Sequence, residues 1–258
     1  MSELNVLSLF AGVGGIELGL ESAGMATVGQ VEWDDYCQKV LERHWPNTAR
    51  HDDVSTAVEW WQSEPRPRVD VVCGGFPCQP FSLAGKQLGV NDERWMWPQT
   101  AAVIRAVQPR YALLENVSAL VRDSWAFGTV LSDLHTLGFD AEWATLRASD
   151  FGAPHGRERV YILAYPKGEY GISRGGLVPS RERGTSLTTG GLSGLAVHQR
   201  RERASQWLAS EPRVDRLADG IPNQSHRLRC AGNAVVPAVA EHIGHLIANH
   251  SKAMEVAA

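Results

Sequence analysis

The sequence has few cysteines and no long hydrophobic run. It contains four cysteines in 258 residues, and no two are spaced as Cys-x-x-Cys, so we expect no zinc site and no metal cofactor. No apolar segment approaches the ~20 residues of a membrane-spanning helix, which argues against a membrane partner. The amino terminus lacks the basic start and cleavage site of a signal peptide. These absences favour a cytoplasmic protein with reduced thiols.

A strong net charge is also absent, but the charges are unevenly distributed. The whole chain has a formal charge of −4. Residues 151–229 hold 13 Lys/Arg against 7 Asp/Glu, a net of +6, whereas the remainder holds 12 against 22, a net of −10. A basic segment on an acidic protein indicates a surface for a polyanion, although a solvated Arg-rich loop gives the same pattern.

Short apolar segments alternate with helical patterns over the first 165 residues, which predicts an α/β fold with a largely parallel sheet. Strands are expected at 5–10, 27–31, 69–73, 111–114 and 159–164. Helices are expected at 16–23, 35–44, 101–107, 127–137 and about 237–249. Residues 251–258 are expected to form a frayed, disordered tail.

A glycine-rich loop, Phe10-Ala11-Gly12-Val13-Gly14-Gly15, joins the first expected strand to the first helix. Such a loop lets a ligand approach the backbone near a helix amino terminus. Glu32 ends the next strand, where an acid can accept both hydroxyls of a ribose. The dinucleotide pattern G-x-G-x-x-G is incomplete because Glu17 replaces its third glycine, so an adenosyl group without a pyrophosphate fits better. A tight turn with an incidental surface acid remains an alternative.

A second turn, GGFPCQPFS at 74–82, follows the third expected strand. Ligands bind outside the carboxyl ends of strands in open α/β sheets, so Cys78 is a candidate nucleophile. Nearby positive charge would favour its thiolate, and Arg157 and Arg159 would supply it if their loop folds beside the turn. The other cysteines are interpreted as structural: Cys37, Cys73 and Cys230.

Seven segments occur in an order that resembles the DNA (cytosine-5)-methyltransferases, especially the compact bacterial and phage types. They are LSLFAGVGGIELGLESAGM (7–25), VEWDDYC (31–37), HDDV (51–54), VDVVCGGFPCQPFSLAGKQLG (69–89), ENV (115–117), DFGAPHGRERVYILA (150–164) and RLRCAGNAVVPAVAEHIG (227–244). Together they extend over about 200 residues of the chain. The combination and order of Pro-Cys-Gln, Glu-Asn-Val, Arg-x-Arg and Gly-Asn-Ala-Val carry the resemblance.

The resemblance implies a Rossmann-like, S-adenosylmethionine-dependent methyltransferase fold with a mostly parallel seven-stranded sheet. It implies one catalytic domain built from residues 1–165 and 217–250, and a small irregular target-recognition region over 167–216. S-adenosyl-L-methionine would be the cofactor, lying over the first two strands. The residues expected to contact it are Phe10, Gly12, Gly14, Glu32, Trp33, Asp53, Val54, Asn233 and Val235.

The resemblance also assigns the chemistry. Cys78 would add to C6 of cytosine, because C5 is too weak a nucleophile to take a methyl group unaided. Glu115 would bind the N3 and N4 edge, Arg159 would hold the base at O2, and Arg157 would support the site.

The cytosine would have to flip out of the duplex to reach the site. A lid is expected at about 83–99, where Trp95 and Trp97 either cover the base or belong to the core of the next helix. Arginines suit both phosphate contacts and guanine recognition. The residues expected to contact DNA are Ser82, Arg94, Arg174, Arg181, Arg183, Arg200, Arg201 and Arg203.

Two departures from the family pattern stand out: the recognition segment is short, and His155 stands where Gln is common. The leading hypothesis is a monomeric methyltransferase of double-stranded DNA, acting either beside a cognate restriction endonuclease or as an orphan enzyme. The same chemistry on tRNA, a non-catalytic DNA-binding relative and a nucleotide-dependent oxidoreductase are the alternatives. Intact Cys78, Glu115 and Arg159 argue against the non-catalytic relative, and the incomplete glycine pattern argues against the oxidoreductase.

Overall fold

The computed structural model describes residues 3–77, 95–169, 177, 230, 232 and 234–257. Its strands are β1 (Leu4–Leu9), β2 (Met25–Val31), β3 (Ala49–His51), β4 (Val71–Gly74), β5 (Tyr111–Val117), β6 (Phe139–Arg147) and β7 (Glu158–Pro166). Its helices are α1 (Gly15–Ser22), α2 (Asp35–His44), α3 (Ala57–Gln62), α4 (Trp97–Val107), α5 (Ser124–Thr136) and α8 (Pro237–Ala257). Short 3-10 turns are η1 (Val54–Thr56), η4 (Ser118–Arg122) and η5 (Ala148–Phe151).

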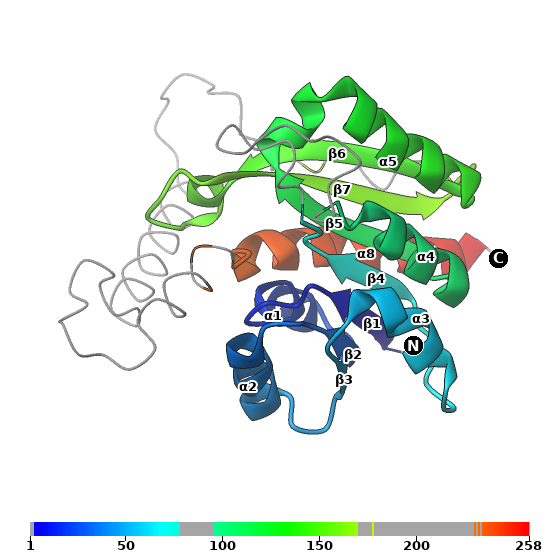
Figure 1. Cartoon of the computed structure of the whole chain (residues 1–258). Coiled ribbons are helices and arrows are strands. Elements are labelled where there is room, and N and C mark those ends of the chain that lie inside the picture. Colours follow the sequence, from blue (N-terminus) through cyan, green and yellow to red (C-terminus); the bar gives the residue numbers. More distant parts are fainter. Residues whose placement is uncertain are drawn as a thin grey trace, which may run out of the picture.

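The strands form one sheet in the order β3-β2-β1-β4-β5-β7-β6 (Figure 1). The first five in this order are mutually parallel, whereas β7 is antiparallel to both β5 and β6. The predicted α/β fold with a mostly parallel seven-stranded sheet is confirmed. The antiparallel insertion brings the start of β7 to the carboxyl edge of the parallel strands.

Side chains of the central strands alternate between two buried layers, as the two-residue period of a strand requires. On β4, Val71 and Cys73 pack with α1 and α8, whereas Val72 packs in the layer that holds α3, α4 and α5. Both faces of the sheet are therefore covered by helices, which accounts for the continuous apolar runs in the central strands. Cys73 is fully buried, which confirms that its thiol is structural.

Three glycines allow α8 to pack closely against α1, although the two helices are more than 200 residues apart. A Cβ on Gly15 would lie 2.3 Å from the Val235 carbonyl oxygen, and one on Gly19 would lie 2.3 Å from that of Pro237. Gly244 on α8 faces α1 in the same way. The carboxyl-terminal helix thus returns beside the glycine-rich loop (Figure 1).

Helix α8 continues through most of the segment that was expected to be disordered. It runs to Ala257, Ser251 is buried, and the Ser251 hydroxyl accepts a hydrogen bond from Arg110 Nη1 at 3.2 Å. The His250 ring contacts the Tyr111 hydroxyl at 2.9 Å. The prediction of a frayed tail is therefore wrong for residues 251–257, because α8 packs on β5 beyond the expected helix end.

The two tryptophans of the expected lid belong to the core. Trp97 begins α4 and is 1% exposed, and Trp95 is 5% exposed. Their rings pack against Phe76, with ring centroids 5.4 and 5.9 Å away respectively. The core alternative is thus confirmed.

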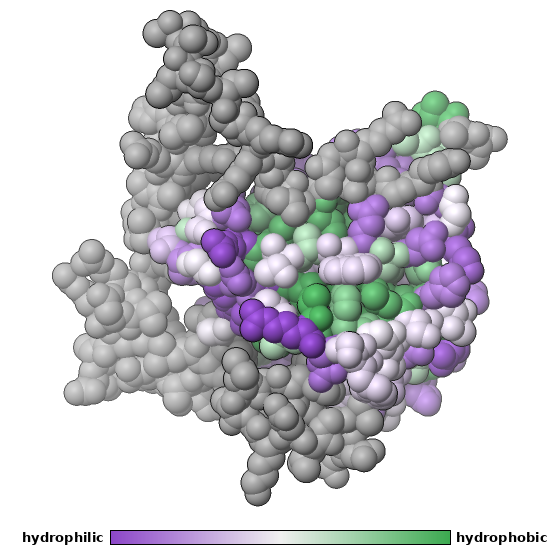
Figure 2. Space-filling model, turned by 90° about the horizontal axis from the view of Figure 1, so that it is seen from above, coloured by the Kyte–Doolittle hydropathy of each residue, from purple (hydrophilic) through white to green (hydrophobic). Residues whose placement is uncertain are grey.

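The surface is mixed in character. Viewed from above, a hydrophobic area is bordered by hydrophilic side chains (Figure 2). Within the described residues, no helix is both long enough and apolar enough to cross a bilayer.

Candidate active site

A cavity of about 460 Å³ opens at the carboxyl edge of the parallel strands. This edge includes the point between β1 and β4 where the strand order reverses, the usual ligand position in open α/β sheets. The cavity is lined by the loops after β1, β2 and β4, by the carboxyl end of β5, by the start of β7 and by the residues before α8. Predicted site residues in its wall are Phe10, Gly12, Glu32, Trp33, Glu115, Arg157, Arg159 and Val235.

Glu32 is held by backbone donors on one side of the cavity. Its Oε2 accepts from Gly12 N at 2.7 Å, and its Oε1 accepts from Asp34 N at 2.9 Å. Burial raises the pKa of Glu32, and the backbone hydrogen bonds from Asp34 and Gly12 oppose that shift. The carboxylate therefore has a fixed orientation, and each oxygen keeps a further lone pair for a ligand hydroxyl.

The residues around Glu32 leave room for a ligand with a planar ring, such as a nucleobase. Gly12 has φ +59 and nothing within 4 Å of the position that a Cβ would occupy. Phe10 also has a positive φ, 54°, which is rare for a bulky residue and indicates a constrained loop. The Trp33 side chain is 84% exposed at the cavity wall, a position from which an indole can stack on a base.

Three residues predicted to contact the cofactor lie outside the cavity lining. Gly14 has φ +88, and a Cβ there would lie 2.4 Å from the Trp45 ring, so this glycine serves the entry into α1. Val54 is buried in the core, and Asp53 Oδ1 accepts from Ser55 N at 2.8 Å at the start of η1. Their contact with a cofactor stays a prediction.

An ion pair dominates the opposite side of the cavity. Glu115 on β5 is paired in register with Tyr161 on β7, which places Arg159 diagonally across from it, and Glu115 Oε1 lies 3.0 Å from Arg159 Nε. Burial raises the pKa of Glu115, while Arg159 and then Arg157 oppose the rise. Burial lowers the pKa of Arg157, and the charge of Arg159 adds to that effect. The predicted catalytic Glu, Arg and Arg are therefore brought together.

The turn after β4 is shaped around Glu115. A Cβ on Gly75 would lie 2.7 Å from Glu115 Oε2, so only glycine leaves this carboxylate in place. Asn116 is buried, and its Nδ2 donates to the Phe76 carbonyl oxygen at 2.8 Å. Asn116 thereby fixes the turn that leads into Cys78, which itself lies outside the described residues.

The remaining predicted site residues also lie outside the described part of the chain. They are Asn233 of the cofactor set and Ser82, Arg94, Arg174, Arg181, Arg183, Arg200, Arg201 and Arg203 of the DNA set. Their roles stay predictions.

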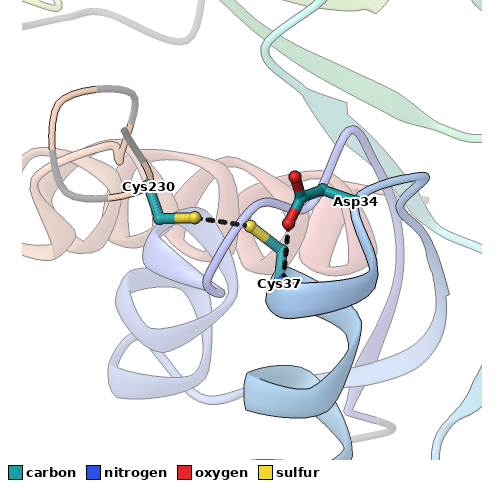
Figure 3. A group of neighbouring side chains, drawn as sticks. All are labelled: Asp34, Cys37 and Cys230. Atoms are coloured by element: carbon teal, nitrogen blue, oxygen red, sulfur yellow. Dashed lines mark hydrogen bonds between the residues drawn. The ribbon is translucent and has the colours of Figure 1, made fainter. Parts of the chain in front are cut away.

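A close thiol pair in the cavity wall was missed by sequence reasoning. Cys37 Sγ on α2 and Cys230 Sγ, before α8, are 3.0 Å apart (Figure 3). Asp34 caps α2, with its Oδ1 accepting from Tyr36 N and Cys37 N at 3.0 Å. One ligand atom from each of Asp34, Cys37 and Cys230 lies within 4.8 Å of the others, so the described residues supply three ligands where a closed structural zinc site uses four. No local pattern reveals this pair, because the two cysteines are 193 residues apart.

Comparison with known sequences identifies one family. The family described as C-5 cytosine-specific DNA methylase matches residues 4–184. The chain is 38% identical over 162 residues to the Type II methyltransferase M.NgoBI of Neisseria gonorrhoeae, covering 62% of this chain and 50% of that protein. It is 38% identical over 170 residues to M.HaeII of Haemophilus aegyptius, covering 64% and 51%. The chain thus spans about half the length of these curated relatives.

Solved structures agree on the fold. One, described as a DNA modification methyltransferase encoded within an E. coli prophage, has a TM-score of 0.70 at 19% identity and covers 97% of this chain and 100% of that chain. The S. pombe Dnmt2 methyltransferase has a TM-score of 0.64 at 17% identity, covering 98% and 99%. At these identities the likeness concerns the fold alone.

Proposed function

The chain belongs to the C-5 cytosine-specific DNA methylase family, and we propose that it transfers a methyl group from S-adenosylmethionine to C5 of a flipped-out cytosine in duplex DNA. The observation that carries this proposal is the meeting of Glu115 and Arg159 with the Glu32 pocket in one cavity. A methyl donor and a base can therefore be held against each other.

The cofactor half of the cavity fits an adenosyl ligand. Glu32 offers two oriented carboxylate oxygens to ribose hydroxyls, and the open space beside Gly12 admits the sugar close to the backbone. The exposed Trp33 indole gives the adenine a stacking surface. When bound, S-adenosylmethionine supplies an electrophilic methyl group on a sulfonium. Phe10 and Val235 close the apolar part of the same pocket.

Cys78 is the proposed nucleophile. Its thiolate adds to C6 of cytosine, which makes C5 electron-rich enough to take the methyl group. The C5 proton then leaves to a base, the C6–S bond breaks, and the thiolate is released. Two observations support this role: Pro77, the residue before Cys78 in the sequence, lines the cavity, and Asn116 donates to the Phe76 carbonyl oxygen in the same turn.

Glu115 is proposed to hold the N3 and N4 edge of the base. A carboxyl group with a raised pKa shares a proton with N3 more readily than an exposed glutamate does, and this stabilises the charge that develops as the thiolate adds to C6. Arg159 keeps Glu115 in place and faces the same cavity, from which it can donate to O2 of the base. Arg157 adds positive charge beside both.

DNA is favoured over tRNA because the relatives M.NgoBI and M.HaeII are Type II methyltransferases. The Arg-rich segment over 167–216 is proposed as the part that binds the duplex. We further propose a monomer that acts in the cytoplasm, since one chain carries every motif and the three described cysteines are free thiols. A cognate restriction endonuclease would act on the same DNA site.

The test is transfer of labelled methyl from S-adenosylmethionine to unmethylated duplex DNA, with tRNA in parallel and Cys78→Ala as control. We expect label in DNA that depends on Cys78. Label only in tRNA would assign the enzyme to the other substrate, and label in neither polymer despite cofactor binding would contradict the proposed activity.

A further inference from the structure

The proposed mechanism does not use the two buried thiols in the cavity wall. Cys37 lies in the first turn of α2 and Cys230 in the short helical turn before α8, and they are 5% and 7% exposed. Their sulfur atoms are 3.0 Å apart, and both are free thiols (Figure 3). Both side chains line the cavity that contains Glu32 and Val235.

The two sulfur atoms need only a small movement to form a disulfide. A disulfide bond requires about 2.03–2.05 Å between the sulfurs, so the two atoms need to approach by only about 1 Å. Each cysteine is anchored through its backbone: Cys37 N donates to Asp34 Oδ1, and the Cys230 carbonyl oxygen accepts from Ala234 N at 2.9 Å. The pair is thus held together before any oxidation.

We propose that Cys37 and Cys230 are an oxidative modification site, at which a peroxide forms a disulfide that ties α2 to the segment before α8. One thiol loses its proton and attacks a peroxide oxygen. The O–O bond breaks, water leaves, and a sulfenic acid forms. The second sulfur attacks this sulfenic sulfur, the S–S bond forms, and the oxygen departs as water. Two thiols are oxidised by two electrons, and one hydrogen peroxide is reduced to two waters.

The surroundings of Cys37 disfavour its thiolate form. Burial raises the pKa of the Cys37 thiol, and the neighbouring Cys230 and the charges of Glu32 and Asp34 raise it further. Disulfides that are readily reduced are those whose thiolates are stabilised by a low pKa. Here the thiolate gains no such stabilisation, so the disulfide forms slowly and then persists until a strong dithiol reductant acts.

The bond closes a loop between residues 193 positions apart in a chain of 258. It connects the part of the cavity wall on α2 with the part that precedes α8. A cross-link across such a long loop lowers the conformational entropy of the unfolded chain and so stabilises the folded protein. The oxidised protein should therefore melt several degrees above the reduced protein. The tie also limits separation of α2 from the segment that carries Val235, so cofactor exchange should slow; this consequence alone rests on the proposed function.

Peptide mapping tests the site directly. Tryptic cleavage places Cys37 in peptide 1–39 and Cys230 in peptide 230–252, while Cys73 and Cys78 share peptide 69–86. The Cys78→Ala variant is incubated with hydrogen peroxide. It is then unfolded in denaturant that contains a thiol-alkylating reagent, and it is digested with trypsin without reductant. We expect peptide 1–39 linked to peptide 230–252, an intact mass lower by two hydrogens, and an alkylated Cys73. Dithiothreitol should reverse the link.

Matched variants keep the outcome clear. Cys37→Ser and Cys230→Ser should each abolish the link and the rise in melting temperature. Alkylation of both cysteines after oxidation, or a link to peptide 69–86 in place of the expected one, would overturn the proposal. The proposal would also be overturned if the purified protein contained zinc and the link formed only after the zinc was removed, because the thiols would then be metal ligands. The mapping measures no methyl transfer and uses a variant without the proposed nucleophile, so its outcome is independent of whether the proposed function holds.

Discussion

The two sides of the active-site cavity are built by different means. Glu32 is oriented by two backbone N–H groups, from Gly12 and Asp34, which are present whatever side chains those positions carry. Glu115 is oriented by one arginine side chain, Arg159, and by the absence of a side chain at Gly75. The cofactor side should therefore tolerate neighbouring substitutions, whereas the base side should depend on particular residues.

The largest expected effect comes from Glu115→Gln. The amide cannot share a proton with N3, so we expect kcat to fall by about 10²–10⁴. Binding of S-adenosylmethionine, measured by calorimetry, should be unchanged because Glu32 lies on the other side of the cavity. A variant with near-normal kcat would contradict the role of Glu115.

The next largest effect is on the free energy of unfolding, and it comes from Glu17 in the first turn of α1. Burial raises the pKa of Glu17 to about 7. Because the folded pKa exceeds the unfolded value of 4.5, stability falls as pH rises from 4.5 to 7 and stays low above it. The full penalty is about 3 kcal/mol. The free energy of unfolding of Glu17→Gln, measured with denaturant at several pH values, should lose most of this pH dependence. An unchanged dependence of stability on pH would show that Glu17 is not its source.

Glu32→Ala tests the cofactor side. Loss of the carboxylate removes the two proposed ribose contacts and leaves Gly12 N and Asp34 N unpaired. We expect S-adenosylmethionine affinity to fall about 10–100-fold, as for loss of charged hydrogen bonds. The rate at saturating cofactor should change much less. A fall in kcat with unchanged Kd would reverse the assignment of the two sides.

The smallest expected effect comes from Gly75→Ala, because the added Cβ would push the Glu115 carboxylate out of its position. The carboxylate is the flexible end of its side chain, so the protein should fold, but kcat should fall about 10-fold through misplacement of a catalytic group. Gly128→Ala on α5, where nothing lies within 4 Å, is the matched control and should leave kcat unchanged. Equal rates for the two variants would show that Gly75 does not position Glu115.

Local pattern was sufficient for the central sheet and for the motifs. Helix α2 is predicted at its observed bounds because its cap and the following proline are local signals. Strand β6 was missed although Phe139, Ala141 and Trp143 alternate with two acidic residues, and β3 was missed because it is only three residues long. Helix α3 was missed for a similar reason, since it has six residues.

Long-range contacts explain what the motifs did not reveal. The glycines of the first loop were interpreted as ligand-approach residues, yet Gly14 accommodates Trp45 and Gly15 accommodates Val235. The contact of Cys37 with Cys230 likewise depends on the return of α8 to α1. Each requires a partner distant in sequence, which no window of residues can show. The placement of Glu115 and Arg159 in one site was implied only by the family resemblance, and the ion pair between them was not predicted.

The central claim is covalent methylation of cytosine through Cys78. The most direct measurement uses duplex DNA with 5-fluorocytosine at the position that single-base mapping of 5-methylcytosine identifies. Fluorine blocks loss of the C5 substituent, so we predict a complex that survives denaturation, requires S-adenosylmethionine and is absent in Cys78→Ala. Failure to trap a complex, with enzyme that methylates the normal duplex, would contradict the covalent mechanism.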